Sequence, residues 1–135
     1  MAEMMVDSNV LLDVLTEDPA WFDWSSRSLE ECAQNHLLVI NPIIYAEVSI
    51  GFERIEDLDA ALPESMVARR SIPLEAAFLA GKCFQRYRQR GGQKRTTLPD
   101  FFIGAHAAVQ GLALITRDVA RYRSYFPGVK LINPH

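Results

Sequence analysis

Four acidic residues stand where their carboxylates could act together on one substrate. They are Asp7, Glu47, Asp100 and Asp118, hereafter the four acids. Clustered carboxylates repel one another, and hard divalent cations with oxygen ligands, Mg²⁺ or Mn²⁺, are the usual compensation. Such ions polarise a phosphoryl oxygen, lower the pKa of a bound water and clamp the attacking and leaving oxygens. The chemistry indicated is metal-assisted phosphodiester hydrolysis.

Each acid also has a structural explanation. Asp7 and Asp118 could cap the helices that follow them, and Asp100 could favour the N-terminus of its helix electrostatically. Glu47 is harder to explain in this way, because by the three-and-four spacing rule it shares a helical face with apolar residues such as Ile43. A glutamate inside an apolar stripe costs free energy unless something pairs with it. Together, the four acids favour a metal site over separate structural roles.

Residues 97–118 predict the unit that positions two of the acids. The first part is almost entirely apolar and predicts a buried helix, ended by Gly111 in the left-handed conformation. The apolar run 112–115 predicts a strand covered on both faces. A helix packed on a parallel strand runs antiparallel to it, so Asp100 and Asp118 should meet at the carboxyl edge of the sheet, where ligands bind.

The rest of the chain alternates strands with helices. Further strands are expected at residues 4–6, 37–40, 67–72 and 129–132. A further helix is expected to follow Ser8, which would cap it, and others are expected at residues 18–35, 43–52, 56–62, from 73 or 74 onwards, and 119–125. The strand at 67–72 contains arginines and is expected near a sheet edge. This order predicts an α/β fold with a parallel sheet, as one domain over residues 1–135.

Composition bounds the class of protein. The apolar runs are too short to cross a bilayer and the first residues open no signal peptide, so a cytoplasmic protein without a membrane partner is expected. Cys32 and Cys83 are expected to be core thiols. A net charge of −3 argues against a simple basic nucleic-acid binder, but without the four acids 13 acidic residues stand against 14 basic ones.

A basic stretch lies just before the Asp100 helix. Its cationic residues are Arg86, Arg88, Arg90, Lys94 and Arg95, with one tyrosine and a Gly-Gly turn between them. It can be a solvated helix end, whose cations are favourable at a helix C-terminus. It can equally be a rim that holds RNA phosphates beside the acids. The sequence leaves both interpretations open.

Two further groups have mainly structural explanations. A metal-free histidine mechanism is disfavoured, because His106 is turned away from Asp100 on a helix, His36 precedes a strand at the opposite edge, and His135 ends the chain. A set of large apolar residues near the start is most simply core, although some members could line a groove for a partner helix. That set is Leu11, Leu12, Leu15, Trp21, Phe22 and Trp24.

Four segments resemble PIN-domain ribonucleases, most closely the VapC-type toxins of toxin–antitoxin pairs. They are Met-Val-Asp-Ser-Asn, Ile-Tyr-Ala-Glu-Val, Leu-Pro-Asp-Phe-Phe-Ile-Gly-Ala and Ile-Thr-Arg-Asp-Val-Ala-Arg-Tyr, at residues 5–9, 44–48, 98–105 and 115–122. The resemblance covers essentially the whole chain in the right order. It implies a parallel five-stranded sheet between helices, in agreement with the elements predicted above.

The resemblance also implies roles for particular residues. The four acids would be the Mg²⁺ or Mn²⁺ ligands around a water nucleophile, and Asn9 and Thr116 would orient them. Many relatives carry another acid three residues after the last aspartate, whereas this chain has Arg121 there, a departure that bears on a second metal. The implied partners are an RNA substrate, a cognate VapB-type antitoxin and a second copy of the chain in a homodimer.

The sequence therefore predicts a Mg²⁺- or Mn²⁺-dependent endoribonuclease toxin that a cognate antitoxin neutralises. The alternative is a non-catalytic α/β binding or regulatory module with a vestigial acidic site. The presence of all four acids favours the enzyme.

Overall fold

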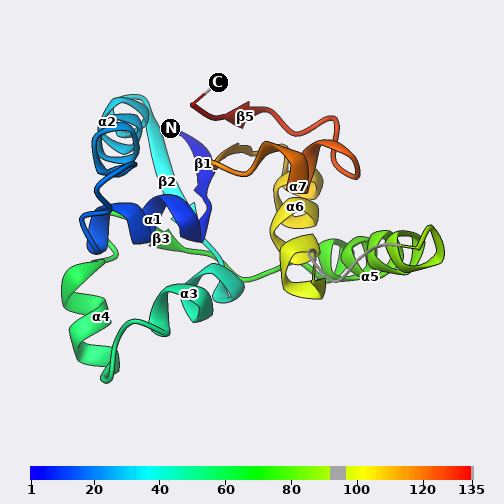
Figure 1. Ribbon diagram of the computed structural model, residues 1–135, viewed down its shortest axis with the longest axis horizontal. Helices are drawn as coiled ribbons and strands as arrows, with labels where there is room; N and C mark the ends of the chain where they lie inside the picture. Colours follow the sequence, from blue (N-terminus) through cyan, green and yellow to red (C-terminus); the bar gives the residue numbers. More distant parts are fainter. Residues whose placement is uncertain (92–96, 135) are drawn as a thin grey trace.

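The fold centres on a parallel sheet of five strands in the order β3-β2-β1-β4-β5 (Figure 1). In this computed structural model, residues 1–91 and 97–134 are described. The strands are β1 (Ala2–Val6), β2 (His36–Ile40), β3 (Ala68–Arg69), β4 (Ala113–Ile115) and β5 (Leu131–Ile132). All pairings are parallel. The predicted α/β fold is confirmed, and β3 lies at an edge as expected.

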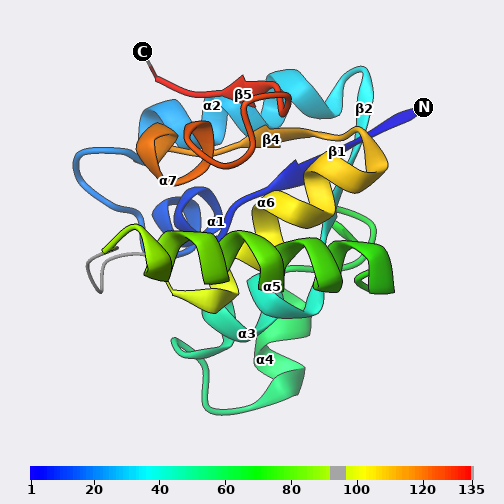
Figure 2. The same ribbon diagram turned by 90° about the vertical axis from the view of Figure 1, so that its right-hand side faces the viewer.

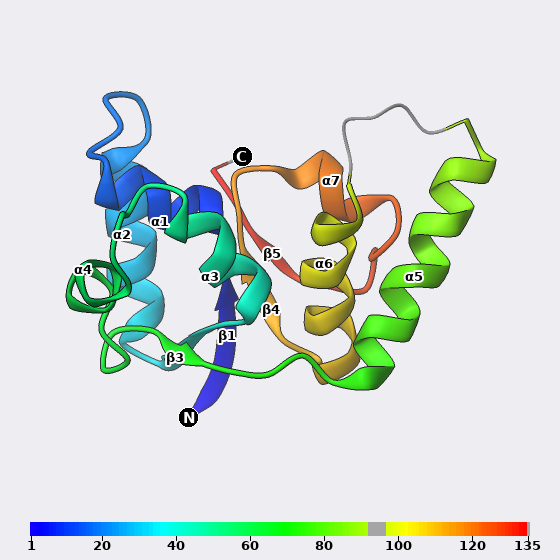
Figure 3. The same ribbon diagram turned by 90° about the horizontal axis from the view of Figure 1, so that it is seen from below.

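Seven helices flank this sheet within the described residues. They are α1 (Ser8–Leu15), α2 (Phe22–Ala33), α3 (Pro42–Ser49), α4 (Ile55–Ala61), α5 (Leu74–Gln89), α6 (Leu98–Gln110) and α7 (Val119–Arg123). Helices α1, α2 and α4 lie on one side, and α5, α6 and α7 lie on the other (Figures 1 and 3). Helix α5 crosses the outer side of α6 (Figure 2).

The core forms because the central strands are apolar on both faces. Met5 and Val6 of β1, Val39 of β2, and Leu114 and Ile115 of β4 have no exposed surface. Parallel strands buried in this way carry near-continuous hydrophobic runs instead of alternating ones. The carboxyl ends of β1 and β4 therefore sit firmly side by side, with Val6 opposite Ile115.

Helix α6 is the buried helix that the sequence predicts, except for its last turn. Its positions from Asp100 to Ala107 are mostly buried, whereas Ala108 to Gln110 are exposed. Gly111 ends the helix at φ +64°. A Cβ atom at Gly104 would collide with the Phe126 ring, so the close approach of the following loop requires glycine there. This packing fixes α6, and with it Asp100, against the sheet.

Several predicted boundaries were wrong for local reasons. Asp7, not Ser8, is the N-cap of α1, because its side chain accepts the Ser8 N–H. Helix α2 starts later than residue 18, because the Asp18 carboxylate accepts the N–H groups of Ala20 and Trp21 and forms a turn instead. Strands β3 and β5 are shorter than the predicted runs.

Two expectations from composition are answered by the structure. Cys32 and Cys83 are free thiols, the first half-buried and the second buried, as predicted. Among the described residues, none of the helices combines the length and the apolar character needed to span a bilayer.

Candidate active site

The carboxyl edge of the sheet gathers the elements that carry the four acids. Asp7 directly follows β1, and its backbone N–H donates to the Ile115 carbonyl at the end of β4 at 2.9 Å. Asp118 follows the same strand by a short turn and is the N-cap of α7. Asp100 lies in the first turn of α6, and Glu47 lies on α3 after β2. The predicted meeting of these elements at one edge is confirmed.

Asp7 is completely buried and accepts hydrogen bonds on both oxygens. Oδ1 accepts the Ser8 N–H at 2.8 Å, and Oδ2 accepts the hydroxyls of Thr116 and Tyr122, each at 2.8 Å. Burial raises the pKa of this carboxyl above its ordinary value, although the bonds from Tyr122 and Thr116 oppose the change. The ionised form is therefore undercompensated and favours a nearby positive charge.

Glu47 is joined to the N-terminus of α1. Its Oε1 accepts the Ser8 hydroxyl at 2.9 Å, which supplies the partner that a glutamate on an apolar face needs. Burial raises the pKa of Glu47, the Ser8 bond opposes this, and the nearby Asp7 and Asp100 carboxylates raise it further. Two of the other three acids, Asp7 and Asp100, thus act electrostatically on Glu47.

Asp100 and Asp118 are linked by the guanidinium of Arg121. Nη1 lies 3.1 Å from Asp100 Oδ1, and Nε lies 3.1 Å from Asp118 Oδ2. The second oxygen of Asp100 accepts the Thr97 N–H at 2.8 Å and the Thr97 hydroxyl at 3.0 Å. Arg121 therefore belongs to α7, the helix that Asp118 caps, and its side chain bridges Asp118 and Asp100.

The donor set suits a hard divalent cation, but the side chains are not arranged around a common centre. Among the described residues, no group of three or more His, Cys, Asp or Glu residues is placed to hold a metal ion. The contacts give the reason: Arg121 takes up Asp100 and Asp118, while Asp7 turns to Thr116 and Tyr122. All-oxygen ligands and two carboxyls whose pKa is raised by burial nevertheless fit Mg²⁺ or Mn²⁺. The metal-ligand role of the four acids stays a prediction.

Asn9 and Thr116 lie where the resemblance implies. The Thr116 hydroxyl donates to Asp7 and accepts the Asp118 N–H at 3.0 Å, so it connects two of the acids. The Asn9 amide group lies 3.4 Å from Asp7 Oδ2, and its carbonyl accepts the Arg117 N–H at 3.3 Å. Both side chains hold the turn after β4 against the start of α1.

The sequence reasoning missed one residue of this network and gave two others a different role. Tyr122 has no exposed surface and donates to Asp7; a tyrosine one helical turn after Asp118 was the available signal. Burial raises the pKa of Tyr122 well above its ordinary value, so it is a neutral donor. Ser8 was expected only as a cap, and Arg121 was noted only as a departure.

The described part of the basic stretch forms the exposed end of α5 near α6 and α7. Arg88 lies over the Phe84 ring at 5.9 Å and Arg90 over the Tyr125 ring at 6.0 Å. Phe101, the residue after Asp100, packs against both rings. These contacts place the basic helix end on the same side as Asp100. Arg86 lies in the same last turns of α5, and Lys94 and Arg95 fall outside the described residues.

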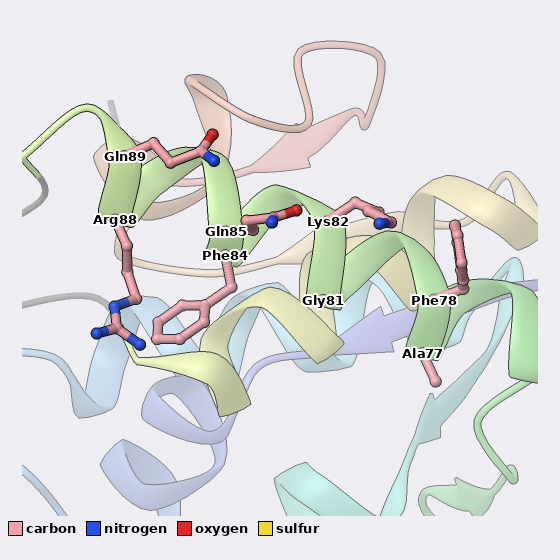
Figure 4. Close-up of a pocket in the computed structure, with 8 residues that line it drawn as sticks. All are labelled: Ala77, Phe78, Gly81, Lys82, Phe84, Gln85, Arg88 and Gln89. Carbon is pink, nitrogen blue, oxygen red and sulfur yellow. The ribbon is translucent and has the colours of Figure 1, made fainter.

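A hollow of about 580 Å³ along α5 is separate from the acids (Figure 4). All of its lining residues, among them Phe78, Lys82 and Arg88, belong to this one helix. It is an open helix face and brings no chemistry-bearing residues together from different elements.

The histidines do not reach the acids. His106 is completely buried, with Nδ1 3.1 Å from Asn41 Nδ2 and Nε2 2.9 Å from Gln110 Oε1. Burial lowers its pKa. His36 begins β2 at the opposite edge, with Nδ1 3.3 Å from the Cys32 carbonyl. The structural or incidental role of these two histidines stays a prediction, and His135 lies outside the described residues.

The apolar set near the N-terminus divides into core and partly exposed members. Leu11 is 2% exposed and belongs to the core. Leu12, Leu15 and Trp24 are partly buried against that core. Trp21 lies under the Arg117 guanidinium at 4.9 Å, which joins this surface to the turn after β4. A groove for a partner helix stays a prediction, with Leu11 excluded from its lining.

Comparison with known proteins agrees with this architecture. The family model described as PIN domain matches residues 4–125. The fold is similar to solved structures of VapBC2 from Rickettsia felis bound to a DNA fragment from their promoter (TM-score 0.75, 21% identity, 97% of this chain and 98% of that chain), and of a toxin–antitoxin complex from Klebsiella pneumoniae (TM-score 0.70, 23% identity, 98% of both chains). It is also similar to DNA-bound VapBC from Salmonella typhimurium (TM-score 0.71, 19% identity, 98% of both chains). The search of curated proteins found no match.

Proposed function

This chain belongs to the PIN-domain family, and on that basis we propose that it is a VapC-type toxin: an endoribonuclease that depends on Mg²⁺ or Mn²⁺ and is neutralised by an antitoxin. The observation that carries the proposal is the gathering of Asp7, Glu47 and Asp100 at one sheet edge, where the first and third raise the pKa of Glu47, with Asp118 at the same edge. Buried carboxylates in mutual repulsion cost stability, and function is the usual reason for keeping them.

The four acids would hold the cation, which when bound polarises a phosphoryl oxygen and lowers the pKa of the attacking water. The protein's own groups fix the acids in place. Thr116 and Tyr122 hold one oxygen of Asp7. Ser8 holds one oxygen of Glu47. Such positioning in advance of binding saves the cost of ordering these side chains during the reaction.

RNA would reach the acids across the basic end of α5. Arg86, Arg88 and Arg90, with Lys94 and Arg95 in the segment that follows, would neutralise phosphates of the substrate. Arg88 and Arg90 lie over aromatic rings that pack against Phe101, the residue after Asp100.

A VapB-type antitoxin would bind the partly exposed surface formed by Leu12, Leu15, Trp21 and Trp24. Arg117 lies over Trp21 and directly precedes Asp118, so a segment docked there lies close to the acids. Two similar structures are described as VapBC and one as a toxin–antitoxin complex, which supports an antitoxin partner. We also propose that the protein forms a homodimer and acts in the cytoplasm.

Cleavage of RNA by the purified protein tests the proposal. Wild type should cleave in Mg²⁺ or Mn²⁺ and stop in EDTA, and Asp7→Asn, Asp100→Asn and Asp118→Asn should each lower the rate by orders of magnitude, because each removes a charged ligand from one unit. Undiminished cleavage in EDTA would refute the metal mechanism. A folded wild type that cleaves no RNA under any of these conditions would favour the non-catalytic binding module.

A further inference from the structure

Arg121 stands within the acidic site instead of at its rim. Its side chain is 28% exposed, and the Asp100 side chain that it contacts is only 8% exposed. Two different nitrogens, Nη1 and Nε, reach Asp100 and Asp118 at 3.1 Å each. The backbone N–H of Arg121 also donates to Asp118 Oδ1 at 3.2 Å. The guanidinium is thus anchored from its own helix and bridges to α6.

The charge of Arg121 acts on all four acids. Besides its two ion pairs, it opposes the effect of burial on the carboxyls of Asp7 and Glu47. A guanidinium stays protonated at any pH at which the protein is folded. Arg121 is therefore a permanent positive charge in a place where carboxylates would otherwise demand a metal ion.

The two pairs of acids differ in what remains for a metal. On one side, Asp118 Oδ2 and Asp100 Oδ1 already contact the positive charge of Arg121, and Asp100 Oδ2 accepts the Thr97 N–H. On the other side, Asp7 and Glu47 accept bonds from neutral hydroxyls and from one backbone N–H. Neutral donors do not balance the negative charge of Asp7 and Glu47. A bound cation is therefore needed beside these two carboxylates.

We propose that Arg121 takes the place of a second divalent cation, so that this site binds one Mg²⁺ or Mn²⁺ per chain. The inference rests on the proposed function, because it concerns the same four acids. A purely structural ion pair between α6 and α7 would leave the number of bound ions unchanged when Arg121 is replaced, which makes that number the decisive quantity.

The test is a Mn²⁺ titration of the full-length protein without RNA, by calorimetry and by electron paramagnetic resonance of the free ion. Arg121→Gln removes the charge and retains a polar side chain. Arg123→Gln is the matched control, because Arg123 is an exposed arginine of the same short helix. Wild type and Arg123→Gln should bind one Mn²⁺ per chain, and Arg121→Gln should bind two. One ion in Arg121→Gln, or two in wild type, overturns the inference.

A second measurement needs no variant and so remains decisive if Arg121→Gln does not fold. The Nε–H proton of Arg121, observed by ¹⁵N NMR in wild type, should stay protected from exchange at saturating Mg²⁺, because each carboxylate oxygen has two lone pairs and Asp100 and Asp118 can bind the single ion while they still accept from Arg121. Loss of that protection would show that the ion displaces Arg121 and would overturn the inference. If neither wild type nor folded Arg121→Gln binds any Mn²⁺, the proposed metal-dependent function itself fails.

Discussion

Removing the Tyr122 hydroxyl tests how the protein tolerates an ionised carboxylate in its interior. Tyr122 and Asp7 both have no exposed surface, and the hydroxyl donates to Asp7 Oδ2 at 2.8 Å. Tyr122→Phe deletes this one oxygen and keeps the ring that fills the core. The Thr116 hydroxyl remains as a donor to the same carboxylate oxygen. The change therefore removes one bond to a charge and almost no packing.

The expected loss follows from the charge of the acceptor. A hydrogen bond to a charged group contributes about 1.5–3 kcal/mol, so the free energy of unfolding of the cation-free protein should fall by that amount at neutral pH. With an unfolding entropy of about 2.1 cal/mol/K per residue, this corresponds to a fall of roughly 5–10 °C in Tm. Tyr125→Phe is the matched control, since its half-buried ring packs on Phe101 and its replacement should cost less than about 0.5 kcal/mol.

The loss should also depend on pH. Burial raises the pKa of Asp7 above its ordinary 3.8, so the associated stability is fully present below 3.8 and is lost as pH rises through the folded pKa. Without the Tyr122 bond the folded pKa rises further, because that bond favours the ionised form. The difference between Tyr122→Phe and wild type should therefore grow from acid to neutral pH.

Urea unfolding in EDTA, followed by tryptophan fluorescence and circular dichroism over this pH range, measures the effect. Agreement of the two signals checks that unfolding is two-state. A difference under about 0.5 kcal/mol at neutral pH, or one independent of pH, would refute the reasoning that Tyr122 compensates the charge of Asp7.

Three further predictions concern other parts of the molecule. Arg88→Ala with Lys94→Ala should weaken RNA binding and flatten its salt dependence, because fewer counterions are released. An unchanged dependence of affinity on salt concentration in filter binding would show that the basic stretch is only a solvated surface. Trp24→Asp, in protein shown to be folded, should impair inhibition by the antitoxin, and normal inhibition would place the groove elsewhere. Gly104→Ala should lower the free energy of unfolding by about 1–3 kcal/mol, because its methyl group meets the Phe126 ring; an unchanged denaturation midpoint would contradict this close packing.

The sheet and the edge that carries the acids could be predicted because their signals are local. Short apolar runs gave the central strands, and Gly111, which adopts the left-handed conformation, gave the end of α6. The acids then followed from topology, since each stands next to such an element. The lengths of the edge strands β3 and β5 were overestimated, because a strand extends only as far as it pairs with its neighbour, and each of these pairs over two residues.

The contacts inside the site could not be predicted, because they join distant positions. Tyr122 and Thr116 reach Asp7 across more than a hundred residues, and Ser8 reaches Glu47 on another helix. No local sequence pattern distinguishes an arginine that pairs with two acids at the sheet edge from an arginine that points to solvent. Arg121 stood out only as a departure from the pattern of the resembling family, and its pairing with Asp100 needed the three-dimensional structure.

The contacts of Asp7 join residues that the ribosome synthesises at very different times. Asp7 leaves the ribosome 109 residues before its partner Thr116 and 115 residues before its partner Tyr122. Domains fold as units during synthesis, and β1 lies in the sheet between β2 and the late strand β4. A nascent chain therefore carries Asp7, Glu47 and Asp100 without the strand and helix that hold Asp7 in place. The hydrogen-bond network around Asp7 therefore forms only after the segment that carries Thr116 and Tyr122 has left the ribosome.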